Sequence, residues 1–224
     1  MYPKRPLSEE TIRRPRSFIS NAFFREFWYY LMGPLKRGFI KWDISPNSLT
    51  WWGFIFSAFA GIMFSLGDFG IGGWFVILAA TCDVYDGMLA RARNISLKSG
   101  AFLDSMLDRV GESFFFFGLA WWFRNDAFWF AVLFVTFTSS QVVSYARARA
   151  EGLGFYGTRG FFQRAERLIV LSVGMGLVNY LKAFQLDYMW LVFATIAILA
   201  LGSTQTALSR SIEIFKEIRK TEVS

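Results

Sequence analysis

Six long apolar stretches account for nearly half of this sequence, and they allow few folds. Several approach the roughly 20 residues that a helix needs to cross a bilayer. Backbone groups in hydrocarbon must be hydrogen-bonded within their own segment, so such stretches are expected to be helices. The stretches are Leu49–Leu66, Ile71–Ala90, Ala101–Phe123, Phe128–Ala146, Leu168–Leu181 and Tyr188–Ser203, of which the fifth is short unless Glu166 and Arg167 continue it.

The apolar content exceeds what the core of a soluble domain requires. Apolar residues make up 54% of the chain and aromatic residues 20%, with 27 Phe and 9 Trp. The excess apolar surface is therefore expected to face lipid. We predict an all-α integral membrane protein in which residues 49–224 form one domain of six transmembrane helices.

A different pattern precedes the first apolar stretch. Residues 18–42 read FISNAFFREFWYYLMGPLKRGFIKW, which mixes aromatic residues with scattered charges and is interrupted at Gly33 and Pro34. Such a segment is too interrupted to cross the bilayer and too apolar to be free in water. We expect an amphipathic helix in the membrane interface, within an N-terminal region of residues 1–48.

Basic residues are distributed unevenly between the predicted loops. The connections Gly67–Gly70, Arg124–Ala127 and Lys182–Asp187 contain only Arg124 and Lys182, and the other 22 Lys and Arg lie on or facing the opposite side. The positive-inside rule then makes both termini cytoplasmic, in a multi-pass protein of the cell's inner membrane. The net charge of +7 reflects this asymmetry rather than nucleic-acid binding. The N-terminus also lacks the apolar core of a secretory signal peptide.

The residue types that are missing or rare exclude several kinds of chemistry. The chain contains no histidine, which excludes imidazole ligands, histidine bases and Ser-His-Asp triads. The single cysteine, Cys82, cannot form an intrachain disulfide and lies in an apolar run. Carboxylates are therefore the candidates for acid–base or metal chemistry.

Four aspartates lie at the ends of the second and third predicted helices, where ionisable residues are costly and usually functional. Asp83 and Asp86 are three residues apart and Asp104 and Asp108 are four apart, so each pair projects from one helix face. Two facing helices would bring the four carboxylates together. Their repulsion in a partly desolvated site favours protonation or bound cations.

Divalent cations are the simplest counter-charge for such a group. All-oxygen ligands suit Mg²⁺ or Mn²⁺, and two ions could hold the oxygens of a pyrophosphate during its displacement. Nearby, Gly87, Ala90 and Gly100 permit close approach of a ligand, and the guanidinium of Arg91 suits a phosphate. Taken singly, each of these four residues is equally well explained by helix packing or by a position at the membrane surface.

Together these residues form an extended motif. Residues 83–108 read DVYDGMLARARNISLKSGAFLDSMLD and fit the pattern D-x2-D-G-x2-A-R-x8-G-x3-D-x3-D at every fixed position. This is the signature of the CDP-alcohol phosphotransferases. The six-stretch pattern and the ISPNSLT segment before the first stretch also resemble that family. The resemblance implies a membrane enzyme that transfers a phosphoalcohol group from a CDP-linked donor to an alcohol.

The resemblance also implies roles for individual residues. Asp83, Asp86 and Asp104 are expected to ligate two divalent ions, and Asp108 to act as the base for the acceptor hydroxyl and to contact a metal. The acceptor would attack the β-phosphorus of a donor such as CDP-diacylglycerol, and CMP would leave. The expected CDP-binding residues are Gly87, Ala90, Arg91, Gly100, Pro46 and Asn47, although a turn before a helix explains the last two equally well.

The downstream sequence bears on the choice of acceptor. The segments SYARARAEGLGF and QRAERLI, with Gln205 and Arg210, resemble the phosphatidylinositol-phosphate synthase branch, whose acceptor is itself a phosphate ester. That resemblance favours inositol phosphate and implies a cationic pocket beside the metals. The candidate phosphate-binding residues are Arg147, Arg164, Arg167 and Arg210, each of which is also explained as an ordinary arginine of the cytoplasmic side.

Three other functions stay open at this stage. A phosphatidylglycerophosphate synthase shares the aspartate motif and uses glycerol phosphate as its acceptor. A divalent-cation transporter would explain four aspartates but not the glycines, alanine and arginine at their spacing. A purely structural membrane protein leaves the aspartates unexplained. The family resemblance further suggests a homodimer, for which the sequence pattern locates no interface.

Overall fold

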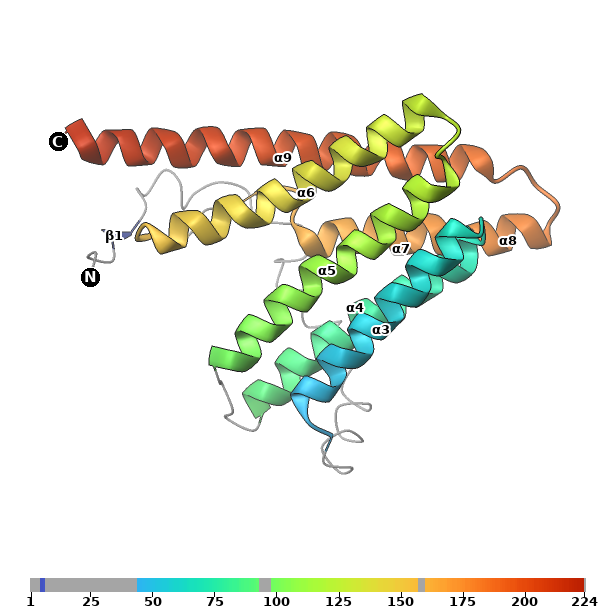
Figure 1. The fold of residues 1–224 in the computed structure, drawn as a ribbon, viewed down its shortest axis with the longest axis horizontal. Coiled ribbons are helices and arrows are strands. Elements are labelled where there is room, and N and C mark those ends of the chain that lie inside the picture. Colours follow the sequence, from blue (N-terminus) through green and yellow to red (C-terminus); the bar gives the residue numbers. More distant parts are fainter. Residues whose placement is uncertain (1–4, 7–43, 93–97, 157–159, 224) are drawn as a thin grey trace.

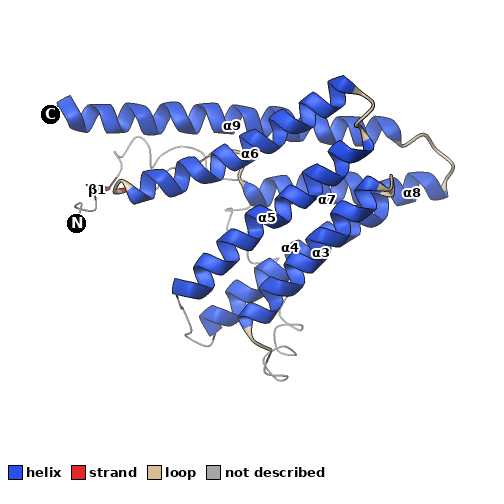
Figure 2. Ribbon diagram, in the orientation of Figure 1, coloured by secondary structure: helices blue, strands red, loops and turns tan. Residues whose placement is uncertain are grey.

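The computed structural model describes residues 5–6, 44–92, 98–156 and 160–223, and these are almost entirely helical (Figures 1 and 2). The predicted interfacial helix of residues 18–42 lies outside the described residues. Two short strands, β1 (Arg5–Pro6) and β2 (Phe155–Tyr156), pair in parallel. The helices of the described part are α3 (Pro46–Ser65), α4 (Phe69–Ala92), α5 (Lys98–Trp122), α6 (Ala127–Gly152), α7 (Arg164–Gly176), α8 (Val178–Ala183) and α9 (Met189–Val223).

Local sequence explains where these helices begin and end. The Ser45 side chain caps α3 by accepting a hydrogen bond from the Ser48 N–H at 3.1 Å, and Pro46 occupies the first helical turn, where proline is favoured. Shortly after α3, Gly67 adopts φ +80°, a conformation that favours glycine. The Asp126 carboxylate accepts hydrogen bonds from backbone N–H groups of the first turn of α6.

The fifth apolar stretch does not form a single helix. It is divided between α7 and α8, with Leu177 between them. Helix α7 begins at Arg164, so Glu166 and Arg167 do continue the stretch. The Glu166 carboxylate accepts a hydrogen bond from the Gln163 N–H at 3.1 Å, which stabilises the start of α7.

Four of the described helices are long and apolar enough to cross a membrane, namely α3, α4, α6 and α9. Helix α5 has sufficient length, at 25 residues, but carries several charged residues, and α7 has only 13 residues. The prediction of an all-α fold is therefore confirmed, with four helices that could cross a membrane. Spans formed by α5 and by α7 with α8 remain predictions.

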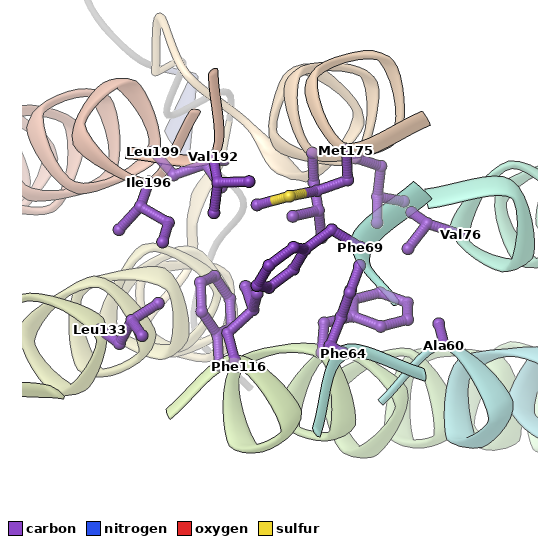
Figure 3. Close-up of a cluster of buried hydrophobic side chains, with 14 of the residues drawn as sticks. Ala60, Phe64, Phe69, Val76, Phe116, Leu133, Met175, Val192, Ile196 and Leu199 are labelled. Atoms are coloured by element: carbon purple, nitrogen blue, oxygen red, sulfur yellow. The ribbon is translucent and has the colours of Figure 1, made fainter. Parts of the chain in front are cut away.

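The helices pack in two groups, which are joined by α7 and by a contact between α5 and α6. Helix α3 packs against α4 and α5, and α6 packs against α9, while α7 packs against both α4 and α9. Figure 1 shows α6 and α9 beside one another and α3, α4 and α5 running together. Side chains from both groups meet in one buried apolar cluster, including Phe64, Phe69, Phe116, Met175 and Ile196 (Figure 3).

Glycines allow the closest helix crossings. A Cβ atom added at Gly118 of α5 would collide with the Gly61 carbonyl of α3, and one at Gly73 of α4 would collide with the backbone at Gly176 of α7. Small residues at such crossings let the helix backbones touch. At 1.5 Å per residue, Gly118 and Gly73 each lie roughly 15 Å along their helix from the nearest aspartate of the candidate site.

Candidate active site

Three of the four predicted metal ligands come together. One carboxylate oxygen from each of Asp83, Asp104 and Asp108 lies within 4.8 Å of the others. Asp83 is on α4, and the other two are one turn apart on α5. The four-residue spacing on α5 therefore does place two carboxylates on one face, directed toward the carboxylate from α4.

The fourth aspartate, Asp86, lies beside this group and not within it. Its side chain is buried, and its Oδ2 accepts a hydrogen bond from the Thr50 hydroxyl of α3 at 2.8 Å. Asp86 lines the same cavity as the other three. Thr50 is not among the residues predicted for the site, although it is in the ISPNSLT segment, one helical turn after Pro46.

A cavity of about 20 Å³ lies among the four aspartates. A volume of this size accommodates about one water molecule, which is the size of a small ion. Side chains from α3, α4, α5 and α7 form its wall. Besides the aspartates, the wall includes Thr50, Gly53, Ser57, Ala79, Ala80, Leu107 and Arg164.

Arg164, the first residue of α7, connects the carboxylates of the two helices. Its Nη1 lies 3.0 Å from Asp83 Oδ2 and its Nη2 lies 2.7 Å from Asp108 Oδ1. These are charge-assisted contacts between side chains that are 20–32% exposed. Of the four arginines proposed for the acceptor, Arg164 is the one that lines the aspartate cavity.

The donor atoms of this site fit a hard divalent cation. All are carboxylate oxygens, which Mg²⁺ and Mn²⁺ prefer. The Asp104 Oδ1 is buried and has no hydrogen-bond partner within the described residues. A buried carboxylate oxygen without a partner is unfavourable, and a cation would satisfy it. Asp83, Asp104 and Asp108, with Asp86 beside them, are thus able to hold a metal.

Two of the remaining candidate arginines lie outside the aspartate cavity. Arg210 of α9 is buried, and its Nη1 donates to the Val143 carbonyl at 2.9 Å, while its Nε and Nη2 have no partner in the described part of the chain. Arg147 of α6 is exposed and pairs with Glu151 at 2.9 Å. Arg210 therefore has two N–H donor groups that a ligand could use, whereas the guanidinium of Arg147 is already paired in part with Glu151.

The last candidate, Arg167, is held in a buried ion pair. Its Nε donates to Glu112 Oε1 at 2.8 Å and its Nη2 to Glu112 Oε2 at 3.2 Å. The two side chains are only 2% and 3% exposed. Glu112 was missed by the sequence analysis, although it continues the four-residue spacing of Asp104 and Asp108 along α5.

The predicted CDP-binding residues gather at neighbouring helix ends. The guanidinium of Arg91, at the end of α4, lies over Gly87, since a Cβ there would come 3.3 Å from Arg91 Nη1. A Cβ at Gly100, near the start of α5, would lie 3.4 Å from Asn47 Oδ1 at the start of α3. Figure 1 shows these ends of α3, α4 and α5 on the same side of the molecule.

Comparison with known proteins bears on these assignments. The sequence profile of the CDP-alcohol phosphatidyltransferase family matches residues 43–201, which include all four aspartates. The chain belongs to this family. The predicted resemblance is thereby confirmed, and the chain is an enzyme of the CDP-alcohol phosphatidyltransferase type.

Other members of the family resemble the chain over most of its length. The phosphatidylinositol phosphate synthase of Mycobacterium marinum is 34% identical over 170 residues, which cover 73% of this chain and 70% of that protein. A crystal structure of the Mycobacterium tuberculosis phosphatidylinositol phosphate synthase with CDP-DAG bound has a TM-score of 0.72 and 29% identity, covering 81% of this chain and 92% of that one. The same synthase in complex with manganese and citrate has a TM-score of 0.73 and 29% identity, covering 81% of this chain and 88% of that one.

Proposed function

We propose that this CDP-alcohol phosphatidyltransferase transfers the phosphatidyl group of CDP-diacylglycerol to inositol phosphate and releases CMP. The acceptor oxygen forms a bond to the β-phosphorus of the donor, and the pyrophosphate bond to CMP breaks. The aspartate group between α4 and α5 carries the proposal, together with relatives that are named phosphatidylinositol phosphate synthases. Family membership leaves no support for a cation transporter or a purely structural protein.

The aspartates supply the ligands for two divalent cations, Mg²⁺ or Mn²⁺. When bound, the cations neutralise the charge that develops on the pyrophosphate oxygens. Asp83 and Asp104 are directed at the common cavity, and Thr50 holds the Asp86 carboxylate at its edge. A manganese complex of a structural neighbour supports this choice of ion.

Asp108 takes the proton from the acceptor hydroxyl. Its carboxylate is in the cavity and is held by Arg164 Nη2 at 2.7 Å, which fixes its orientation. A base must be within hydrogen-bond reach of the proton it removes. The position of Asp108 beside the other carboxylates supports this role, because an acceptor hydroxyl bound to Asp108 would lie next to a donor phosphate bound by them.

The donor headgroup binds at the helix ends next to the aspartates. Gly87, Ala90 and Gly100 leave room for the CDP group, and Arg91 contacts a phosphate. Pro46 and Asn47, at the start of α3, form one wall of the proposed CDP site. The exposure of Arg91 and the position of Asn47 near Gly100 support this arrangement.

The acceptor phosphate is held mainly by Arg164 and Arg210. Arg164 lies against the base, and Arg210 has two buried donor nitrogens without a partner in the described part. An unpaired buried guanidinium is unfavourable, and a phosphate would satisfy it. Arg147 supports the same pocket from α6, and the direct contribution of Arg167 is limited by its bonds to Glu112.

The proposal predicts a selective acceptor profile. Purified protein is incubated with CDP-diacylglycerol, Mn²⁺ and, separately, inositol phosphate, glycerol phosphate, free inositol and serine, and the lipid products are identified by mass spectrometry. We expect product with inositol phosphate alone. Arg210→Ala should raise the KM for inositol phosphate roughly tenfold or more, because a charge-assisted hydrogen bond contributes about 1.5–3 kcal/mol.

Arg124→Ala is the matched control, since its exposed guanidinium lies over the Trp121 ring in the turn after α5, beyond the opposite end of that helix from Asp104. Turnover with glycerol phosphate alone would assign the protein as a phosphatidylglycerophosphate synthase. Equal use of free inositol, or a KM unchanged by Arg210→Ala, would contradict the cationic pocket. CMP release that persists in excess chelator would contradict the metal requirement.

The proposed enzyme is a single domain of six spans, residues 49–224, with its site and both termini at the cytoplasmic face of the inner membrane. The scarcity of basic residues in three of the loops supports this orientation. In a Cys82→Ser background, cysteine at Asn125 should react with an impermeant reagent on intact cells, and cysteine at Glu222 should not. The reverse labelling would overturn the orientation.

We also expect a homodimer, which a monomeric mass in lipid nanodiscs would contradict.

A further inference from the structure

Helices α5 and α7 are joined by two consecutive ion pairs. Asp108 and Glu112 are four residues apart on α5, and Arg164 and Arg167 are three apart on α7. The first pair, Arg164 with Asp108, is inside the aspartate cavity, whereas Arg167 and Glu112 do not line it. The second pair is therefore one helical turn from the reacting groups and does not touch them.

The contacts of α7 explain why this second pair matters. Helix α7 packs closely against α4 and α9. Its contacts with α4 and α9 include glycine crossings, at Gly176 with Gly73 and at Gly174 with Thr195. A glycine at such a contact lets the two helices approach closely but has no side chain with which to make a directional polar contact. The two-bond contact between Arg167 and Glu112, in contrast, permits one geometry because both groups are planar and fixed in orientation.

Stability alone is a poor explanation for this pair. Both side chains are almost completely buried. Removing two charges from water is so unfavourable that apolar residues of similar volume often stabilise a protein equally or better. A buried ion pair in the interior of a helical membrane protein is expected to serve a function.

We propose that the Glu112–Arg167 pair is a positioning pair, which fixes the rotation and depth of α7 so that the Arg164 guanidinium meets Asp83 and Asp108. This inference rests on the proposed function of the same site. It assigns Arg167 an indirect role, because its Nε and Nη2 are bonded to Glu112 and the neighbouring Arg164 makes the contact with the reacting groups. The remaining nitrogen of Arg167, Nη1, is buried and has no partner within the described residues.

The test removes both charges together, so that neither is left buried alone. Glu112→Leu combined with Arg167→Met should fold, with a thermal midpoint within a few degrees of the wild-type value. We expect kcat/KM for transfer from CDP-diacylglycerol to inositol phosphate to fall at least about tenfold, since a misplacement of about 1 Å near reacting groups has effects of this order or larger. Adding Arg164→Gln should give no further loss beyond that of Arg164→Gln alone.

A second measurement does not depend on turnover. Mn²⁺ affinity, read from the electron paramagnetic resonance signal of the free ion, should rise at least about threefold in the double variant and to the same extent in Arg164→Gln, because both withdraw a positive charge from the carboxylates. An unchanged affinity overturns the positioning role. A wild-type protein that fails to transfer to inositol phosphate while this affinity change is present overturns the proposed function and leaves the pair's role intact.

The matched control is the Lys182–Asp68 pair, which links α8 to the turn between α3 and α4 at 3.5 Å and is partly exposed. Lys182→Gln with Asp68→Asn should change neither kcat/KM nor Mn²⁺ affinity, as expected for a surface pair.

A double variant of Glu112 and Arg167 that retains activity within twofold, or whose loss adds to that of Arg164→Gln, contradicts the proposal. If that variant does not fold, Arg167→Lys keeps the charge but not the two-bond geometry; we expect it to lose activity severalfold, and full activity would equally contradict the proposal.

Discussion

Asp104→Asn is expected to lower phosphatidyl transfer by roughly 10³-fold or more. The change removes a negative charge from the three-carboxylate group, together with an oxygen that has no hydrogen-bond partner in the described structure. A bound metal contributes several kcal/mol of charge stabilisation, and each 1.4 kcal/mol is about tenfold in rate. Release of CMP from CDP-diacylglycerol at saturating Mn²⁺ measures the effect.

The same substitution at Asp126, Asp126→Asn, is the control. Asp126 caps α6, where asparagine serves equally well, so activity and stability should remain unchanged. The Asp104 variant should also bind Mn²⁺ more weakly by calorimetry while its thermal midpoint is maintained. Activity within tenfold of the wild-type value would show that Asp104 is not a metal ligand.

Asp108→Asn should abolish transfer and leave donor binding largely intact. The base acts on the acceptor hydroxyl, so its loss should lower kcat by about 10²–10⁴-fold. Asparagine keeps the shape of the side chain and an oxygen that accepts from Arg164, so the arrangement around the cavity should persist. CDP-diacylglycerol binding by calorimetry and single-turnover CMP release separate the two effects.

The pattern of loss identifies the role of Asp108. A large fall in the rate of transfer with an unchanged dissociation constant for the donor is expected for a base. If donor binding is lost and the remaining turnover is unimpaired, Asp108 acts as a donor or metal ligand instead. Asp83→Asn provides the comparison, because a ligand substitution should weaken metal and donor binding together.

Much of the fold and the centre of the site could be predicted from local sequence patterns. The lengths of the apolar stretches predict where the helices lie. Proline, glycine and aspartate mark several helix ends, as at Pro46, Gly67 and Asp126. Helical periodicity predicts the faces on which Asp104 and Asp108 lie. These features depend on residues a few positions apart, so a single sequence contains the necessary information.

Contacts between distant segments could not be predicted in this way. Thr50 meets Asp86 across 36 positions, and Glu112 meets Arg167 across 55. Spacing within a helix shows which residues share a face but not which face of another helix they meet. For that reason Arg167 reads as a free cation in the sequence, although its charge is compensated by Glu112 in the structure. The break at Leu177 was missed because both sides of it are apolar.

The glycine crossing between α3 and α5 affects the angle between these two helices, because their backbones touch there. Gly118 touches the Gly61 backbone there, and the part of α5 from Gly118 to Asp108 is roughly 15 Å long at 1.5 Å per residue. A change of about 5° in the angle between α3 and α5 at this crossing would move the Asp108 end of the segment by roughly 1.3 Å, perpendicular to the helix axis. A shift of that size is enough to misalign reacting groups. The accuracy of the chemistry is thus set partly at the far end of the helix, where a single added methyl group would change the angle.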